Sequence, residues 1–361
     1  MSTTHQNGWA NLAQIDHFDE IIDVRSPAEY AEDHLPGALN YPVLFDEERA
    51  RVGTLYKQQS PFAARKIGAA LIARNIAHHL ETRLQDKPRD WRPLVYCWRG
   101  GQRSGALNHI LRQIGWDACR LEGGYKNWRR QVVLQLITLP GRYHWRVISG
   151  STGSGKSHLL SALAEQGAQV LHLEQLANHK GSVLGVLPHA PQPAQKSFES
   201  ALYVCLRDFD PARPVFVEAE SRRIGRLQLP DALLQAIRTS PKQPIEASLA
   251  ARVDFLLRDY AYFLENRQWL LERLDLLGGL QSGVTLQHWR DLIAHGDFRQ
   301  LVIELLEQHY DPLYQRSQKK TASLHPPLPS CITDDLSRQG IRQLARHLLA
   351  IQDEMPMPPA V

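Results

Sequence analysis

The chain has 361 residues, of which 43% are hydrophobic and 22% charged, and its formal net charge at pH 7 is +4. These values are typical of globular proteins, and the length allows two or three domains. No stretch approaches twenty consecutive apolar residues, which argues against a membrane span. The weak positive charge permits nucleic-acid binding without requiring it.

The cysteines and the N-terminus bear on the cellular compartment. The N-terminal residues lack a basic patch followed by an apolar run, so we expect no secretory signal. The four cysteines lie far apart and form no C-x-x-C pair, which argues against zinc and against a disulfide framework. We therefore expect a protein of the reducing cytoplasm, without a membrane partner.

Predicted strands and helices alternate over the first 130 residues. Extended segments are predicted at 21–24, 38–43 and 93–97, a helical turn at 26–34, and longer helices at 60–85 and 104–114. Such alternation favours a parallel α/β sheet with flanking helices. We place the first domain at residues 12–135.

A second α/β run follows the turn at Pro140-Gly141. Strands are predicted at 145–150, 168–174 and 213–220, and a helical pattern begins at Glu246. We place the second domain at 143–353, with a helical extension at about 246–318. We expect residues 354–361 to be a flexible tail.

The segment GSTGSGKS fits the G-x-x-x-x-G-K-[ST] pattern completely, between a predicted strand and a predicted helix. Its glycines let backbone N–H groups converge on phosphate oxygens at a helix N-terminus. Lys156 would neutralise the outer phosphates, and Ser157 has a hydroxyl able to ligate Mg²⁺. The predicted phosphate- or diphosphate-binding residues are Gly150, Ser151, Thr152, Gly153, Ser154, Gly155, Lys156 and Ser157.

An acidic partner for this loop is expected at the end of a neighbouring strand. The segment VFVEAES supplies Glu218 and Glu220 rather than the usual aspartate, which weakens the case for routine nucleotide hydrolysis. We take both as candidate acids or metal partners. No residue set specifies a metal, and Mg²⁺ beside the phosphates stays an open expectation.

The second motif with chemical meaning is VYCWRGGQRSG, in which Cys97 follows an apolar strand. Cationic side chains and inward-pointing N–H groups lower a thiol pKa, and both are available in the residues that follow. Arginines here would also hold an oxyanion. Besides the reactive Cys97, the candidate anion-binding residues are Trp98, Arg99, Gly100, Gly101, Gln102 and Arg103.

Four separated motifs around this loop resemble the rhodanese family. They are DVRSPAEY (23–30), HLPGALN (34–40), the Cys97 loop and EGGYKNW (122–128), and the resemblance covers roughly residues 10–135. It implies a rhodanese-like fold in which Cys97 carries sulfur or selenium. The loop reads C-x5-R-S, one residue longer than the C-x4-R-S of many rhodaneses. Cysteine phosphatases share the C-x5-R spacing, although Tyr96 stands where they usually have histidine.

A rhodanese-like domain followed by a P-loop NTPase-like α/β domain resembles the tRNA 2-selenouridine synthase family over nearly the whole chain. The strings CWRGGQRSGAL (97–107), LEGGYKNWR (121–129), GSTGSGKS (150–157) and LEQLANHKGSVLG (173–185) carry this resemblance. It implies a transferase that converts wobble 2-thiouridine of tRNA to 2-selenouridine with selenophosphate. An S-geranylated intermediate made from geranyl diphosphate is implied as well. We then expect Cys97 to carry selenium and the P-loop to hold the diphosphate, with no tightly bound cofactor and no ATP hydrolysis.

Further binding residues follow as expectations from that reading. Candidates for the geranyl chain are Phe255, Tyr260, Tyr262, Phe263 and Trp269, and candidates for contact with the anticodon region of tRNA are Arg222, Arg223, Arg226, Lys319 and Lys320. The alternative is a C-x5-R phosphatase or sulfurtransferase of rhodanese fold fused to a P-loop ATPase or kinase. A third hypothesis is a non-enzymatic protein that carries sulfur or selenium to partners. No helical seam predicts an oligomeric state.

Overall fold

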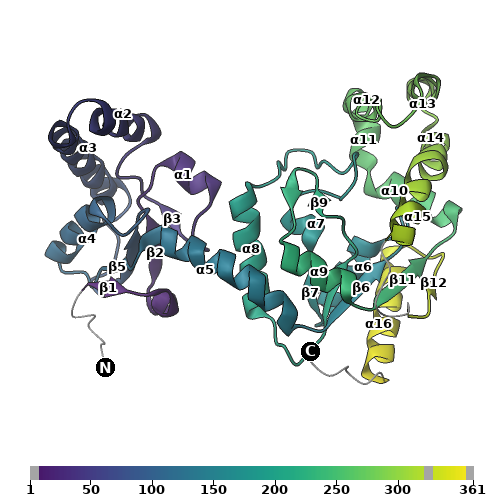
Figure 1. Cartoon of the computed structure of the whole chain (residues 1–361), viewed down its shortest axis with the longest axis horizontal. Helices are drawn as coiled ribbons and strands as arrows, with labels where there is room; N and C mark the ends of the chain where they lie inside the picture. Colours follow the sequence, from purple (N-terminus) through teal and green to yellow (C-terminus); the bar gives the residue numbers. More distant parts are fainter. Residues whose placement is uncertain (1–7, 321–327, 355–361) are drawn as a thin grey trace. The chain divides into compact units, whose positions relative to one another are not determined.

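The computed structural model describes residues 8–320 and 328–354, with side chains for 8–316 and 328–351 (Figure 1). The chain forms two compact units. The N-terminal unit comprises residues up to Gln135 together with Ala194–Val204, and the P-loop unit comprises Leu136–Pro193 and the chain from Cys205 onward. No helix in the described ranges is long and apolar enough to cross a membrane.

The N-terminal unit has a five-stranded, entirely parallel sheet, which confirms the predicted α/β class. The strand order is β1-β5-β4-β2-β3. The strands are β1 (Trp9–Ala10), β2 (Glu20–Asp23), β3 (Leu39–Asn40), β4 (Pro93–Tyr96) and β5 (Cys119–Leu121). Every residue of β4 is buried, as expected for a parallel strand covered on both faces. Of the segment predicted as extended over 38–43, residues 39–40 form strand β3.

Helices cover this sheet. They are α1 (Pro27–Glu32), α2 (Asp46–Gln58), α3 (Pro61–Thr82), α4 (Gln102–Ile114) and α5 (Gly124–Thr138), with a 3-10 helix η1 (Leu12–His17). The predicted long helix at 60–85 and the helix ending before Gly115 are confirmed. Helix α2 was not predicted, because it is largely polar and none of its residues is buried. Three acidic residues in its first turn, Asp46, Glu47 and Glu48, favour a helix start there.

The first part of helix α8 (Gln195–Asp208) belongs to the N-terminal unit, although it is far along the chain. Trp128 on α5 donates its indole N–H to Ser200 Oγ at 3.3 Å and packs against the ring of Tyr203. Ser200 in turn donates to Asp33 Oδ2 at 2.9 Å. The unit is therefore assembled from two separate stretches of sequence.

A buried ion pair lies at the carboxyl end of β2. Arg25 is 1% exposed and its Nη2 lies 2.6 Å from Asp23 Oδ2, while its guanidinium carbon lies 3.9 Å from the centre of the Tyr125 ring. Arg25 also donates to the carbonyl oxygen of Asp33. Asp23 thus neutralises a charge that water does not reach.

Replacing Asp23 by alanine is expected to lower the free energy of unfolding of the N-terminal unit by about 3–5 kcal/mol, since it leaves a buried guanidinium unpaired. Urea unfolding of the full chain, followed by tryptophan fluorescence, measures this change. Asp19→Ala is the matched control, because it breaks a solvent-exposed pair with Arg92. Equal destabilisation by the two substitutions would contradict the prediction.

The P-loop unit has its own five-stranded parallel sheet in the order β12-β11-β6-β8-β7. The strands are β6 (Trp145–Ser149), β7 (Gln169–Leu171), β8 (Val215–Glu218), β11 (Lys242–Glu246) and β12 (Cys331–Ile332). The three strands expected from the sequence are confirmed, whereas β11 and β12 were missed. Strand β11 reads KQPIE, in which a lysine and a proline interrupt the apolar pattern.

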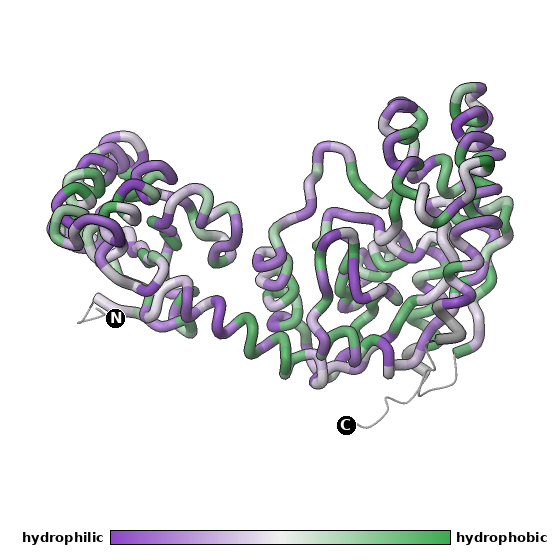
Figure 2. The backbone as a smooth tube through the Cα atoms, turned by 45° about the horizontal axis from the view of Figure 1, so that its top comes forward, coloured by the Kyte–Doolittle hydropathy of each residue, from purple (hydrophilic) through white to green (hydrophobic). Residues whose placement is uncertain are grey.

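Helices surround this second sheet and continue beyond it. They are α6 (Lys156–Glu165), α7 (Leu173–Leu176), α9 (Asp231–Thr239), α10 (Leu249–Asp259), α11 (Ala261–Glu265), α12 (Arg267–Asp275), α13 (Gly283–His295), α14 (Phe298–Leu305), α15 (Asp311–Lys320) and α16 (Arg338–Glu354). Short elements are η2 (Leu139–Arg142), η3 (Leu306–Tyr310) and the antiparallel pair β9 (Arg223–Ile224) and β10 (Leu227–Gln228). Hydrophilic and hydrophobic residues alternate along the helices of this unit (Figure 2), as in helices that bury one side.

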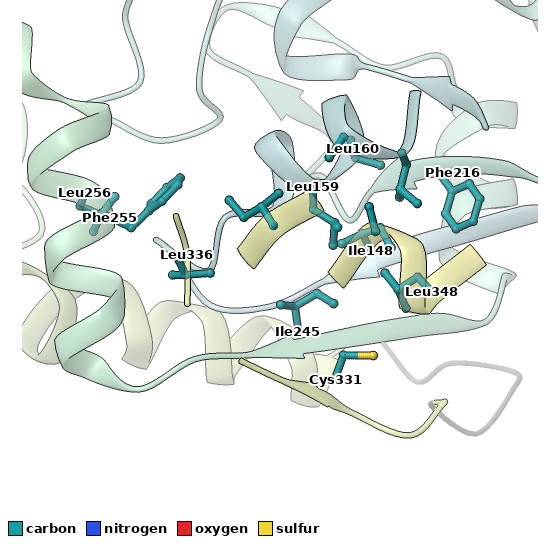
Figure 3. Close-up of a cluster of buried hydrophobic side chains, with 14 of the residues drawn as sticks. Ile148, Leu159, Leu160, Phe216, Ile245, Phe255, Leu256, Cys331, Leu336 and Leu348 are labelled. Atoms are coloured by element: carbon teal, nitrogen blue, oxygen red, sulfur yellow. The ribbon is translucent and has the colours of Figure 1, made fainter. Parts of the chain in front are cut away.

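The core of the P-loop unit fixes α6 against the sheet (Figure 3). Leu159 and Leu160 of α6 pack with Ile148 of β6, and Leu348 of α16 belongs to the same cluster. The helix that follows the phosphate-binding motif is therefore held between the sheet and the C-terminal helix.

Candidate functional site

The GSTGSGKS segment forms the loop between β6 and α6, as its motif predicts. Gly153 has φ +83°, and a Cβ there would lie 2.9 Å from Leu256 Cδ1. Glycine adopts this left-handed backbone without strain, and a larger residue would also crowd the Leu256 side chain. The loop therefore delivers Lys156 and Ser157 to the first turn of α6.

Lys156 and Ser157 bond to atoms close to the loop. Lys156 Nζ donates to the carbonyl oxygens of Gly150 and Ser151, at 2.8 and 3.2 Å. Ser157 Oγ donates to Glu174 Oε2 at 2.6 Å. Burial lowers the pKa of Lys156, against the raising influence of nearby glutamates. A bound phosphate would present negatively charged oxygens to the Lys156 ammonium group. These would replace the two carbonyl oxygens as its hydrogen-bond acceptors.

Three carboxyl groups converge beside the loop. Glu218, at the end of β8, is 1% exposed and accepts the backbone N–H of Glu174 at 2.8 Å. A Cβ on Gly181 would lie 2.8 Å from Glu174 Oε1 and 3.0 Å from Glu220 Oε1, so both side chains face this glycine. The sequence singled out Glu218 and Glu220 but not Glu174. The signal for Glu174 was its place at the start of LEQLANHKGSVLG.

Burial governs the protonation of these acids. It raises the pKa of Glu218 from 4.5 to about 7. Burial also raises the pKa of Glu174, and burial together with the charges of Glu174 and Glu218 raises that of Glu220 well above its usual range. Carboxyl groups that keep their protons do not repel one another.

Replacing Glu218 by glutamine is expected to change the pH dependence of stability. The folded protein holds a proton on Glu218 between pH 4.5 and about 7 that the unfolded chain releases, so wild-type stability falls as pH rises through this window. Glutamine cannot ionise, and E218Q should gain on the order of 2–3 kcal/mol over wild type between about pH 5 and pH 8. Urea unfolding at both pH values measures the difference. The prediction would be contradicted if the difference in unfolding free energy between E218Q and wild type were the same at pH 5 and pH 8.

A cavity of about 800 Å³ opens over the loop. Its walls include the loop itself, the three glutamates, residues 179–183 and parts of α10. Lys180 spans one side, with Nζ 2.8 Å from Asp259 Oδ2 and 4.2 Å from the centre of the Tyr260 ring. The cavity thus combines a cationic, N–H-rich floor with an aromatic wall.

A smaller apolar cavity of about 70 Å³ adjoins the large one. The two share Thr152, Ser182, Leu256, Tyr260 and Tyr310 as lining residues. The rest of its wall consists of Leu184 and apolar side chains of α10, α11, α12, α14 and η3.

The structure places the five candidate aromatic residues differently. Tyr260 and Phe263 line the apolar cavity, and Phe255 and Tyr260 line the large one. Tyr262 and Trp269 line neither and pack against the ring of Phe263, at 4.9 and 4.6 Å between ring centres.

Cys97 lies at the start of a separate loop, in the N-terminal unit, between β4 and α4. Its Sγ accepts the backbone N–H of Gly101 at 3.2 Å and lies 3.2 Å from Ser104 Oγ. A Cβ on Gly124 would lie 2.3 Å from the Cys97 carbonyl oxygen, so α5 begins directly against this loop. The backbone N–H groups of Tyr125 and Lys126 donate to the carbonyl oxygens of Cys97 and Trp98. These bonds hold the loop against the start of α5.

The two arginines of this loop differ. Arg103 forms a bidentate pair with Glu29, at 2.6 and 3.2 Å, and is half-buried. Burial alone would raise the pKa of Glu29, but Arg103 above all, with Ser26 and Arg49, holds it below its usual value. Arg99 is exposed and makes no ion pair or side-chain hydrogen bond with the described residues. Trp98 and Gln102 are exposed, whereas Gly100 is buried and Gly101 exposed.

The basic candidates for tRNA contact are only partly described. Arg222 pairs with Asp231 at 2.7 Å, and Arg226 donates to the carbonyl oxygens of Gln192 and Pro193. Arg223 is exposed on β9. The side chains of Lys319 and Lys320 lie outside the described residues. The expected tail at 354–361 lies almost wholly outside them as well.

Over the described ranges, no group of three or more histidine, cysteine, aspartate or glutamate side chains is arranged to hold a metal ion. All four cysteines, Cys97, Cys119, Cys205 and Cys331, are free thiols. A divalent cation at the P-loop would therefore depend on ligand oxygens in addition to Ser157 and a carboxylate.

Fold and sites together define a rhodanese-like unit with a thiol loop joined to a P-loop unit. The rhodanese-like domain family matches residues 7–131, and the tRNA 2-selenouridine synthase AAA domain family matches residues 143–276. The tRNA 2-selenouridine synthase of Nitrosomonas europaea is 39% identical over 66% of this chain and 63% of its own length. Those of Alcanivorax borkumensis and Marinobacter nauticus are 34% and 32% identical, over 81% and 87% of this chain and 88% and 93% of their own. The chain belongs to the tRNA 2-selenouridine synthase family.

Proposed function

We propose that the chain is a cytoplasmic transferase that converts wobble 2-thiouridine of tRNA to 2-selenouridine, with selenophosphate as selenium donor and an S-geranylated intermediate. The thiocarbonyl sulfur attacks the first carbon of geranyl diphosphate, and diphosphate leaves. Selenium then attacks the ring carbon, and the alkylated sulfur departs as a thiol. Alkylation is useful because a bare thiocarbonyl sulfur is a poor leaving group.

The continuity of the two cavities of the P-loop unit carries this proposal. Lys156 and Ser157 line the large polar cavity, and the adjoining apolar cavity shares five of its lining residues. A ligand with a diphosphate head and a hydrocarbon tail suits this pair of environments better than a nucleoside triphosphate does, since a sugar and base gain little from aliphatic walls. If Mg²⁺ accompanies the diphosphate, Ser157 and Glu174 would lie beside it.

For the selenium step we propose that the sulfur of Cys97 attacks the phosphorus of selenophosphate held by the loop. A sulfur–phosphorus bond forms, the selenium–phosphorus bond breaks, and selenium takes the thiol proton and leaves as hydrogen selenide, with its oxidation state unchanged. Water then hydrolyses the sulfur–phosphorus bond and releases phosphate. The Gly101 N–H donates to Sγ, the attacking atom. Exposed Arg99 is available to the incoming anion, whereas Arg103 is held by Glu29 and would have to share its charge.

Nucleoside analysis tests the proposal. The full chain is produced in bacteria that lack their own 2-selenouridine synthase, with and without added selenite, and tRNA is digested for mass spectrometry. We expect 2-selenouridine only with selenite, and S-geranyl-2-thiouridine to accumulate without it. Absence of both nucleosides, with the protein folded and abundant, would overturn the proposal. ATP hydrolysis stimulated by Mg²⁺ would favour the ATPase or kinase reading instead.

A further inference from the structure

A further cavity of about 500 Å³ lies over helix α6, beside the large cavity of the P-loop. It is distinct from the small apolar cavity and is called the second cavity below. The two cavities share His158, Ser161, Phe255 and Asp259 as lining residues. A molecule lying in the second cavity would therefore approach the phosphate-binding loop along the exposed side of α6.

This second cavity is rich in arginine. Arg258 of α10 lines it together with Arg338 and Arg342 of α16. On α16 the row continues with Arg346, so that three arginines follow at intervals of four residues, about 6 Å apart along the helix axis. Ile341, Ala345 and Leu348 are buried in the core, which turns the arginine row toward solvent.

The pairing of these arginines leaves positive charge available. Arg342 lies 2.9 Å from Glu165 in a half-exposed pair, and Arg258 donates to the carbonyl oxygen of Leu336. Arg338 and Arg346 are exposed and form no ion pair or side-chain hydrogen bond with the described residues.

Acidic residues around the cavity do not cancel this charge. Asp259 is already engaged by Lys180 and His158, at 2.8 and 3.0 Å. Asp335 is exposed and accepts the backbone N–H of Ser337, and Arg258 lies close enough to favour its charged form. Glu165 is left to Arg342, so Arg338 and Arg346 face solvent as free cations.

We propose that this groove, with the row Arg338, Arg342 and Arg346, binds the phosphates of the RNA strand next to the modified base. The inference rests on the proposed function, because the sulfur of that base has to reach a diphosphate ester held at Lys156. RNA recognised at a single base presents a single-stranded loop with the base unstacked. His158 lines both cavities, is half-exposed and lies edge-on to buried Phe255, with 5.0 Å between ring centres, and it offers a ring for such a base.

The groove differs from the basic residues that the sequence suggested. Arg222 is paired with Asp231, and Arg226 is occupied by backbone carbonyls, so neither is as free for phosphate as Arg338 and Arg346. Neither Arg222 nor Arg226 lines the cavities described above.

The test compares two double variants of the full chain with the same change in charge, R338A/R346A and R290A/R299A, because Arg290 and Arg299 lie in exposed ion pairs and line neither cavity. The probe is a 17-nucleotide anticodon stem–loop with 2-thiouridine at the wobble position, and binding is followed by fluorescence anisotropy over a range of salt. We expect R338A/R346A to lose about tenfold in affinity and its salt slope to become shallower by about 1.4, because each phosphate contact in single-stranded RNA contributes about 0.7. R290A/R299A should bind as wild type does. Affinity of both variants for geranyl diphosphate, measured by calorimetry, should stay unchanged.

Two results would overturn the inference. One is an unchanged affinity and salt slope in R338A/R346A, and the other is an equal loss in R290A/R299A. Both leave the proposed function standing if wild type binds the probe. Failure of wild type to bind the probe or to modify tRNA would instead count against the proposed function itself. Restoring binding with R338K/R346K would confirm that charge at this place is what matters.

Discussion

Replacing Lys156 by alanine is expected to abolish both S-geranyl-2-thiouridine and 2-selenouridine in cellular tRNA. The ammonium group is the positive charge next to the loop on the floor of the large cavity, and its loss removes the charge that would neutralise the diphosphate there. We expect the rate of geranylation to fall by about 10²–10³-fold or more, as when one donor is removed from a developing anion. Since selenium replaces the geranylated sulfur, the second nucleoside disappears with the first. Mass spectrometry of digested tRNA measures both.

A lysine elsewhere on the chain serves as the matched control for Lys156. Lys57 is exposed on α2, and K57A removes one positive charge without touching the loop. Both nucleosides should persist in K57A. Normal geranylation in K156A, with the protein folded, would mean that the P-loop does not hold the prenyl donor.

Replacing Cys97 by serine is expected to separate the two steps. The serine hydroxyl can keep the contacts with the Gly101 N–H and the Ser104 hydroxyl, so the loop should hold its shape while the nucleophilic thiolate is lost. 2-Selenouridine should fall below detection, whereas S-geranyl-2-thiouridine should accumulate even with selenite, because alkylation uses the P-loop unit alone. The same nucleoside analysis reads out both products.

Cys205→Ser is the control for the loss of a thiol. Cys205 is half-buried on α8 and far from any anion-binding loop in the sequence. Its variant should make both nucleosides. Geranylation that depended on Cys97 and not on Lys156 would exchange the roles proposed for the two sites.

Elements with strong local signals were predictable from the sequence. The continuous apolar run at β4 and the strand–loop–helix around GSTGSGKS are examples, because burial on both faces and a glycine-rich turn each leave a clear pattern. Strand β11 was not predicted because Lys242 and Pro244 interrupt its apolar pattern. Helix α2 was not predicted because none of its residues is buried.

Residues that depend on tertiary contacts were harder to find. Glu174 gains its place from a hydrogen bond to Ser157 and from facing Gly181, and neither relation is visible as spacing. The sequence shows that Arg103 is a positive charge close to the Cys97 loop. It does not show that Glu29 forms an ion pair with it. The arginine row of α16 has a regular spacing in the sequence, but its meaning depends on the cavity that α6 and α10 build beside it.

The contacts of α8 bear on how the chain can be divided. Asp33 and Trp128 both find their partner in Ser200, which follows them by many residues. A fragment cut after residue 135 would leave the indole N–H without an acceptor and expose the face that Tyr203 covers. A separately expressed rhodanese-like half, or a chimera joined at that point, would therefore be a damaged module. Gene fission or domain swapping in this protein would have to carry residues 194–204 along with the thiol loop.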